Sequence, residues 1–359
     1  MTRNLDCDPY TATDRLRRLL GEGLDAAGLG PLETPYDYVY SETGISLRCY
    51  STGSASIDPV LLIVPAPIKG AYIWDAAPPI SVVQRCIEGG CQVYMVEWTR
   101  PGSCAQDFGL DDYANRLLLK CFNVIQAQTG QPSTYLVGHS LGGTFAALCA
   151  ALHPQRIRGL VLVGTPLNFG RRVAPLDRRV AASPHASVLT ALKDIVPGSL
   201  LDLFALSAAP ESFIWYRWLD WLNSLPDPKA LRSHLLVARW SLDEAPLAGR
   251  LFEEVVEFLY RENRFMRGDL MIGKQKTTPD QIVVPLLTVA DENCNVVPPE
   301  AVLPFHHAVR GTDTELLWYQ GDTGIVFRHV GPLVGRNAHR GLWPQIIRWL
   351  HAHHQRTHE

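Results

Sequence analysis

Apolar runs alternate with helical patterns along the first half of the chain. Residues 59–65, 91–98, 134–139 and 157–166 are rich in Val, Leu and Ile and carry few charges, as expected of strands covered on both faces. A helical pattern over residues 111–128 separates the second run from the third, and an alanine-rich segment follows the third. This alternation predicts an α/β fold with a mostly parallel central sheet and right-handed crossovers.

Further elements are predicted toward both ends of the chain. Residues 13–27 predict an amphipathic helix whose leucines share one face: Leu16, Leu19, Leu20 and Leu24. Residues 36–41 and 45–51 are joined by Glu42-Thr43-Gly44, which predicts a hairpin. Later the strand pattern resumes in "VVPLLTVAD" and "ELLWYQG", and "LWPQIIRWLHAH" predicts a closing helix.

The hydrophobic pattern changes from strand-like to helix-like between residues 169 and 280. Aromatic, helix-like segments such as "ESFIWYRWLDWLNSL" dominate there, and buried-strand runs are missing. We therefore predict one α/β core, residues 1–168 and 281–359, into which residues 169–280 are inserted as a helical cap. The tryptophans of this cap are expected to pack within it rather than to bind a ligand: Trp215, Trp218 and Trp221.

Composition and charge exclude several classes of protein. The chain has 359 residues, of which 47% are hydrophobic and 19% charged, as in a well-cored globular protein. Lys+Arg 33 against Asp+Glu 36 offers no case for nucleic-acid binding. No apolar run approaches membrane-spanning length, and the first residues hold no signal-peptide core. Eight cysteines without C-x-x-C pairs predict neither a disulfide framework nor a metal site, so a cytoplasmic protein without a cofactor is expected.

The segment "TYLVGHSLGGTFAALCAA", residues 134–151, places one serine between glycines at a strand-to-helix turn. Its G-x-S-x-G pattern is typical of the nucleophile elbow of the α/β-hydrolase fold. Such a turn is strained, so side chains at the glycine positions would collide with neighbouring backbone. It lifts the Ser140 hydroxyl over a helix N-terminus, where free N–H groups favour negative charge. Ser140 is therefore the predicted nucleophile.

A serine hydroxyl needs a base, and histidine is the usual base at neutral pH. In this fold the chain order is nucleophile, acid, histidine, which places the histidine after the last core strand. His329 and His339 both lie there, and His329 is favoured because Val330-Gly331 follows it in a tight loop. His339 is expected to cap or pack at the last helix. His139, next to Ser140, is expected to point elsewhere.

The acid loop is unusual. After the strand "VPLLTVA" a loop of the form G-x-x-D-x-x-V-P is expected, but the sequence reads "ADENCNVVPPE". Counting back from Val297 puts Cys294 in the acid position and Asp291 in the glycine position. Either the loop is remodelled so that Asp291 or Glu292 reaches the histidine, or the third member is neutral. Of these, Asp291 is favoured as the catalytic acid. An acid relocated to the loop after residues 159–166 would fall near Asn168, which is also uncharged.

The oxyanion hole requires two preorganised N–H donors. One is predicted to be Leu141, immediately after the nucleophile. The other is predicted in the loop after "LLIVP", at Ala66 or Ile68, because Pro65 and Pro67 have no N–H group.

Several longer segments can be compared with known families: "VPAPIKGAYIWDAAPPISVVQRCIEGGCQVYMVEW", "YLVGHSLGGT" and "GTPLNFG", and in the cap "WSLDEAPLAGRLFEEVVEFLYRENRFMRGDL". Over these segments the sequence resembles the polyhydroxyalkanoate synthases and their α/β-hydrolase relatives. The resemblance resumes in "HVGPLVGRNAHRGLWPQIIRWL" and so covers most of the chain from about Val60 onward. It implies that the catalytic histidine is His329.

Two departures from that family bear on function. The synthases carry cysteine in the elbow, whose thiolate exchanges readily with acyl-coenzyme A thioesters, whereas Ser140 would form a more stable oxoester. The acid of the family corresponds to Cys294 here. Both changes argue against processive polymerisation and favour one-step acyl transfer or hydrolysis.

Two functions follow from these observations. The first is a serine-dependent enzyme that forms an acyl-Ser140 intermediate from an ester or thioester, with a slight preference for hydrolysis over transfer to an alcohol or amine. The acyl group, a hydroxyacyl or related group, would be carried by coenzyme A, a carrier protein or neither, and a homodimer is an open alternative. The second is a non-catalytic synthase-like partner or granule-associated protein, which the missing acid supports.

Overall fold

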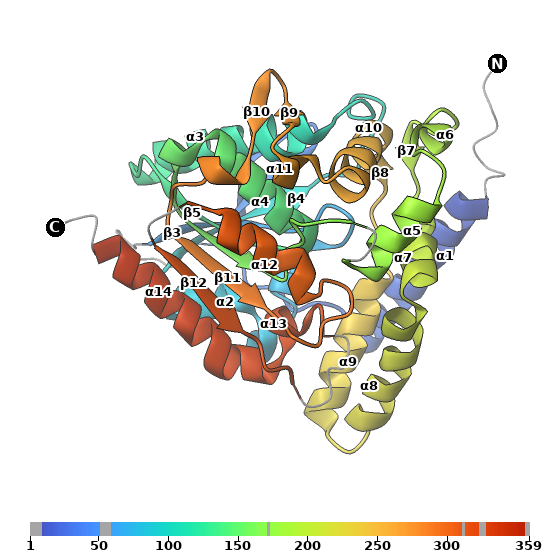
Figure 1. Ribbon diagram of the computed structural model, residues 1–359. Helices are drawn as coiled ribbons and strands as arrows, with labels where there is room; N and C mark the ends of the chain where they lie inside the picture. The colour runs from blue at the N-terminus through green and yellow to red at the C-terminus, as the bar shows by residue number, and fades with distance from the viewer. Residues whose placement is uncertain (1–8, 51–58, 171–172, 311–312, 323–327, 356–359) are drawn as a thin grey trace.

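The computed structural model describes the chain in five stretches: residues 9–50, 59–170, 173–310, 313–322 and 328–355. An eight-stranded sheet forms its centre, in the order β1-β2-β4-β3-β5-β6-β11-β12 (Figure 1). The strands are β1 (Asp37–Glu42), β2 (Ile45–Tyr50), β3 (Val60–Val64), β4 (Gln92–Trp98), β5 (Thr134–His139), β6 (Ile157–Val163), β11 (Leu286–Ala290) and β12 (Thr314–Trp318).

The strand directions confirm the predicted mostly parallel sheet. β2 pairs antiparallel with β1, as the predicted hairpin requires, and also pairs antiparallel with β4. The remaining neighbours, from β4 through β3, β5, β6 and β11 to β12, are parallel. In such a sheet the carboxyl ends of the strands share one edge, and ligands bind in the crevice outside those ends.

Helices cover both faces of the sheet. They are α2 (Val82–Glu88), α3 (Leu117–Thr129), α4 (Ser140–Leu152), α12 (Pro299–Ala308), α13 (Gly331–Val334) and α14 (Trp343–Gln355). Figure 1 shows α3 and α4 on the opposite side of the sheet from α14. Alternate residues of β3 enter two different buried clusters: Leu62 packs with α3 and α4, and Leu61 packs with α2 and α14. Both faces of the strand are therefore apolar, which explains its continuous hydrophobic run.

A largely helical region connects β6 to β11. Its helices are α5 (Pro175–Ala182), α6 (Ser187–Thr190), α7 (Gly198–Ala208), α8 (Tyr216–Ser224), α9 (Pro228–Ser241), α10 (Gly249–Glu254) and α11 (Arg264–Arg267). Its strands are short: β7 (Ile195–Val196), β8 (Leu247–Ala248), β9 (Leu270–Ile272) and β10 (Gln275–Thr277). From Leu247 onward this region contributes buried residues, including Leu251 and Phe265, to the cluster in which Leu62 packs with α3 and α4.

The N-terminal helix α1 (Pro9–Leu24) lies beside α7 and α9, away from the sheet (Figure 1). Arg17 of α1 forms an ion pair of 2.6 Å with Asp202 of α7, and Arg239 of α9 pairs with Asp25 at 2.7 Å. The division into a core of residues 1–168 and 281–359 and a cap of residues 169–280 stays a prediction. The contacts of α1 show that an N-terminal element also belongs spatially to the helical region.

Several apolar side chains lie on the outside of this region. Leu16, Leu19 and Leu20 share a face of α1, as predicted, but that face is exposed. Trp215 and Trp218 are 62% and 60% exposed, so the prediction that they pack within the cap is wrong for both. Trp218 instead meets Trp221 edge to face on the surface of α8. Within the five described stretches, no helix combines the length and the apolar character needed to cross a membrane.

Candidate active site

Ser140 occupies a strained turn between β5 and α4. Its φ of 54° lies in the left-handed region, which non-glycine residues rarely adopt. The glycines around it are required by close backbone contacts. A Cβ on Gly138 would come within 2.5 Å of Gly143 Cα, and one on Gly142 would collide with the carbonyl oxygen of Val64. The helix can therefore start directly against the end of β3, which leaves the serine side chain facing the cavity at the sheet edge.

His329 lies within hydrogen-bonding distance of Ser140. Its Nε2 is 3.0 Å from Ser140 Oγ, the distance expected of a nucleophile and its base. Burial lowers the pKa of His329 well below its ordinary value, and the neighbouring His139 adds to this effect. The imidazole is therefore neutral at pH 7 and can accept the serine proton.

His139 does not point away from the site, contrary to expectation. It also lines the cavity, its ring centroid lies 4.6 Å from that of His329, and its Nε2 is 2.8 Å from the His329 carbonyl oxygen. Burial lowers the pKa of His139 to about 4, so the ring is neutral and donates a hydrogen bond to this carbonyl. His139 is the last residue of β5, and strand alternation turns it toward the side from which the His329 loop approaches.

The acid loop places a thiol at the second nitrogen of His329. Cys294 Sγ lies 4.0 Å from His329 Nδ1 and accepts a hydrogen bond from the Val297 N–H at 3.4 Å. Burial raises the pKa of Cys294 to about 11, so the thiol is uncharged at neutral pH. The register counted from Val297 is therefore the one that the structure adopts.

Asp291 is engaged by Arg328, the residue before the candidate base. The guanidinium Nε and Nη2 contact its carboxylate at 2.8 and 2.7 Å, and the Asn293 N–H donates to it at 2.8 Å. Glu292 is exposed, and Asn168 donates a hydrogen bond to the Glu300 carbonyl. Arg328 was not predicted from the sequence, although an arginine adjacent to the histidine is the natural partner for a loop carboxylate.

The residues predicted for the oxyanion hole line the same cavity as Ser140: Leu141, Ala66 and Ile68. Leu141 follows Ser140 at the N-terminus of α4, where N–H groups have no partner within the helix. The loop after β3 is fixed at two points. The Trp98 indole N–H donates to the Pro65 carbonyl at 2.7 Å, and the Ala245 N–H donates to the Ile68 carbonyl at 3.0 Å.

His339 lies elsewhere, in the packed region beside α14. It is buried, and its Nε2 is 2.8 Å from the Leu333 carbonyl oxygen. This agrees with the packing role predicted for it from its position at the last helix.

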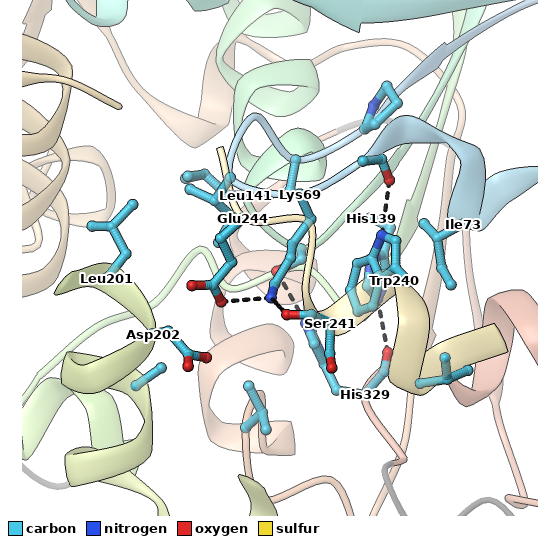
Figure 2. A pocket seen from close by; sticks show the side chains of 18 of the residues that line it. Lys69, Ile73, His139, Leu141, Leu201, Asp202, Trp240, Ser241, Glu244 and His329 are labelled. Atoms are coloured by element: carbon cyan, nitrogen blue, oxygen red, sulfur yellow. Dashed lines mark hydrogen bonds and ion pairs between the residues drawn. The ribbon is translucent and has the colours of Figure 1, made fainter. Parts of the chain in front are cut away.

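The cavity over Ser140 measures about 210 Å³ and lies between the sheet edge and the helical region. Most of its lining is apolar, including Ile73 from the core, Leu201 from α7 and Val237 from α9. Lys69, Asp202 and Glu244 interrupt this apolar lining (Figure 2). These three residues were not predicted from the sequence, because each is an ordinary charged residue there and only the fold brings them together.

Comparison with known proteins agrees with this architecture. Residues 59–196 match the family model described as alpha/beta hydrolase fold. The chain also resembles the solved monoacylglycerol lipase of Paleococcus ferrophilus, with a TM-score of 0.57 and 16% identity, over 87% of this chain and 100% of that one. The protein therefore has the α/β-hydrolase fold.

Similarity to curated proteins shows which α/β-hydrolases this chain resembles. The poly(3-hydroxyalkanoate) polymerase subunit PhaC of Haloferax mediterranei is 31% identical over 89% of this chain, which spans 64% of that relative's length. The subunit PhaC of Allochromatium vinosum is 28% identical over 93% of this chain and 94% of its own. The chain is therefore similar over most of its length to polyhydroxyalkanoate polymerase subunits, which confirms the resemblance seen in its sequence.

Proposed function

We propose that this α/β-hydrolase-fold enzyme transfers acyl groups from an ester or thioester through an acyl-Ser140 intermediate. The observation that carries the proposal is the 3.0 Å contact between Ser140 Oγ and His329 Nε2 at a strained elbow beside a cavity. The relatives in Haloferax and Allochromatium are poly(3-hydroxyalkanoate) polymerases, which supports a hydroxyacyl or related acyl group as the substrate.

The first half-reaction forms the acyl-enzyme. His329 Nε2 takes the hydroxyl proton as Ser140 Oγ attacks the acyl carbon. The N–H groups of Leu141 and of Ala66 or Ile68 would stabilise the oxyanion of the tetrahedral intermediate. The carbon–sulfur or carbon–oxygen bond to the leaving group then breaks, and His329 returns its proton to the departing thiolate or alkoxide.

The second half-reaction releases the acyl group. His329 removes a proton from water, an alcohol or an amine, which attacks the carbonyl carbon of the acyl-Ser140 ester. The bond between that carbon and Ser140 Oγ then breaks, and His329 returns the proton to Oγ. We favour water, and so an esterase or thioesterase, because a serine oxoester does not keep the acyl group as activated as a cysteine thioester does. The substrate would be carried by coenzyme A, by a carrier protein or by neither, and a homodimer remains part of the proposal.

The third catalytic position is proposed to be neutral. The Cys294 thiol faces His329 Nδ1, and Asp291 is paired with Arg328. A thiol stabilises an imidazolium less than a carboxylate does, so the base would be weakly supported and turnover slow. Asp291 would act as the acid only if its carboxylate left Arg328.

We propose a cytoplasmic location. All seven cysteines within the described stretches are free thiols, as expected in a reducing compartment.

The experiment that tests the proposed function is covalent capture. Wild-type protein should be labelled by a serine-directed fluorophosphonate, and its intact mass should rise by one acyl group after incubation with acyl thioesters. Ser140→Ala should abolish both signals. Labelling of wild type without any acyl adduct or turnover across a panel of chain lengths would instead favour the non-catalytic granule-associated partner, which the uncharged third position supports.

A further inference from the structure

An ionisable cluster forms part of the wall of the candidate acyl cavity. Lys69, Asp202 and Glu244 line this cavity together with Ser140 and His329. Figure 2 shows Lys69 extending toward Glu244, with Asp202 beside them. Lys69 belongs to the loop that carries Ala66 and Ile68, so the cluster begins one residue after a predicted oxyanion donor.

The cluster is tightly connected. Lys69 Nζ donates to Glu244 Oε1 at 2.5 Å and to the Ser241 carbonyl at 2.9 Å. Lys69 and Glu244 also form an isolated antiparallel bridge between their backbones. Their side chains are 16% and 7% exposed, so the pair is nearly enclosed.

Arg17 completes the network from behind. It pairs with Asp202 at 2.6 Å, and its Nη1 lies 3.6 Å from Glu244 Oε2. Asp202 would therefore keep a cationic partner if Lys69 and Glu244 were both replaced.

Burying charged side chains in the wall of a cavity costs free energy that the binding of a hydrocarbon chain does not recover. Burial lowers the pKa of Lys69 and raises the pKa of Glu244, because both charged forms lose hydration. Replacing a buried ion pair by apolar side chains of similar volume is often neutral or stabilising. An enzyme that binds only alkyl chains would thus be served better by an apolar wall. A substrate with its own hydrogen-bonding group gains from the charged wall.

The cavity has room for such a substrate. An engineered apolar cavity of about 150 Å³ holds one benzene molecule, and the cavity here measures about 210 Å³. It can therefore accommodate a short acyl group.

We propose that Lys69 and Glu244 determine specificity by favouring short acyl groups that carry a hydrogen-bonding substituent over alkyl groups of the same size. An ammonium has three donors. Two donors of Lys69 contact Ser241 and Glu244, and in this proposal the third serves a substrate oxygen. A substrate with a methyl group at the position of that oxygen would leave this N–H of Lys69 without a partner, so the substrate would bind less well. This inference rests on the proposed acyl transfer through Ser140.

The test compares two nearly isosteric substrates. The N-acetylcysteamine thioesters of 3-hydroxybutanoate and 3-methylbutanoate differ by a hydroxyl in place of a methyl group, and release of the thiol gives kcat/KM for each. Wild type should prefer the hydroxylated substrate by at least about tenfold. Lys69→Met/Glu244→Met should bring the ratio close to one or reverse it, while turnover of the 3-methylbutanoyl substrate is retained or increased.

A matched control uses the surface pair Arg85 and Glu88, which lie 2.6 Å apart on α2. Arg85→Met/Glu88→Met removes the same two charges outside the cavity and should leave the ratio unchanged. If the first double variant does not fold, as judged by circular dichroism, Lys69→Gln/Glu244→Gln removes both charges with less change in polarity and provides the comparison.

A preference that is the same in wild type and in the cavity variant, or a wild-type ratio near one, would overturn the specificity role. Neither result affects the proposed function if turnover still depends on Ser140. Conversely, full turnover by Ser140→Ala would refute acyl transfer through the serine, whatever the substrate ratio.

Discussion

The nucleophile side of the candidate site and its acid side differ in how fully each meets the needs of acyl transfer. On the nucleophile side, Ser140 is held in a left-handed conformation and His329 lies 3.0 Å away. On the acid side, a thiol 4.0 Å from His329 Nδ1 stands where a carboxylate is expected, and Asp291 is bound to Arg328. The groups that would touch the substrate are in place, whereas the support of the base is unusual.

This difference bears on the energy of the transition state. His329 must become an imidazolium in a buried position, and the lowered pKa shows that this charge is costly there. In a triad a carboxylate offsets that cost and holds the correct tautomer. An enzyme with this site should therefore be slow but not inactive, and substitutions on the two sides should have very different effects.

The largest effect is expected on the nucleophile side. Ser140→Ala should lower turnover of acyl thioesters by as much as about 10⁶-fold, the scale seen for loss of a serine nucleophile. Only Oγ is removed, so the melting temperature and circular dichroism spectrum should stay close to those of wild type. Undiminished labelling of this variant by a fluorophosphonate would show that another residue is the nucleophile.

The base comes next. His329→Ala should lower kcat by about 10³- to 10⁴-fold or more, because the hydroxyl proton then has no acceptor and loss of a triad histidine can cost as much as loss of the serine. His339→Ala is the matched control: it should lower stability, since a buried side chain that contacts the Leu333 carbonyl is lost, with little change in kcat. Steady-state kinetics on both variants decides the assignment, and the reverse ranking would refute it.

A smaller effect is expected from His139, which holds the loop of the base. His139→Phe keeps a ring beside His329 but loses the hydrogen bond to its carbonyl, so kcat should fall by about tenfold, the scale of one modest hydrogen bond. His139→Gln retains a donor and should recover part of that loss. KM should change little in either variant. A change confined to KM would mean that His139 contacts substrate and does not position the base.

The central fold could be predicted from the sequence because its signals are local. The apolar runs at β3, β4, β5 and β6 reflect burial on both faces, and the glycines around Ser140 reflect contacts within one turn. The position of His329 followed from chain order in this fold, and its contact with Ser140 agrees with that prediction.

Features set by tertiary contacts were harder to predict. The leucine face of α1 indicated burial, yet Arg17 on the same helix docks it on Asp202 and leaves Leu16 and Leu19 exposed. Asp291 pairs with Arg328, which lies 37 positions later in the sequence. The charged wall of the cavity joins Lys69 to Glu244 across 175 positions of the chain. None of these pairings has a periodicity or a spacing that the sequence alone reveals.

The smallest expected effects test the acid side itself. Cys294→Asp would place a carboxylate near His329 Nδ1, where the Val297 N–H that now contacts Sγ could bind one of its oxygens. We expect kcat to rise several-fold. Asp291→Asn should change kcat by less than about tenfold, because it acts on Arg328 and only indirectly on the base. A fall of about 10⁴ in Asp291→Asn, the loss seen when a triad carboxylate becomes an amide, would instead show that Asp291 is the acid during turnover.

The pH dependence distinguishes these alternatives further. Turnover requires neutral His329, whose pKa lies well below its ordinary value, so the acid limb of kcat/KM should lie well below about pH 6.5 in wild type. A carboxylate at position 294 favours the imidazolium and raises that pKa. The acid limb of Cys294→Asp should therefore move to higher pH, and activity should be lost earlier on acidification. A pH profile identical to that of wild type would show that the new carboxylate does not reach the histidine, and any gain in kcat would then have another cause.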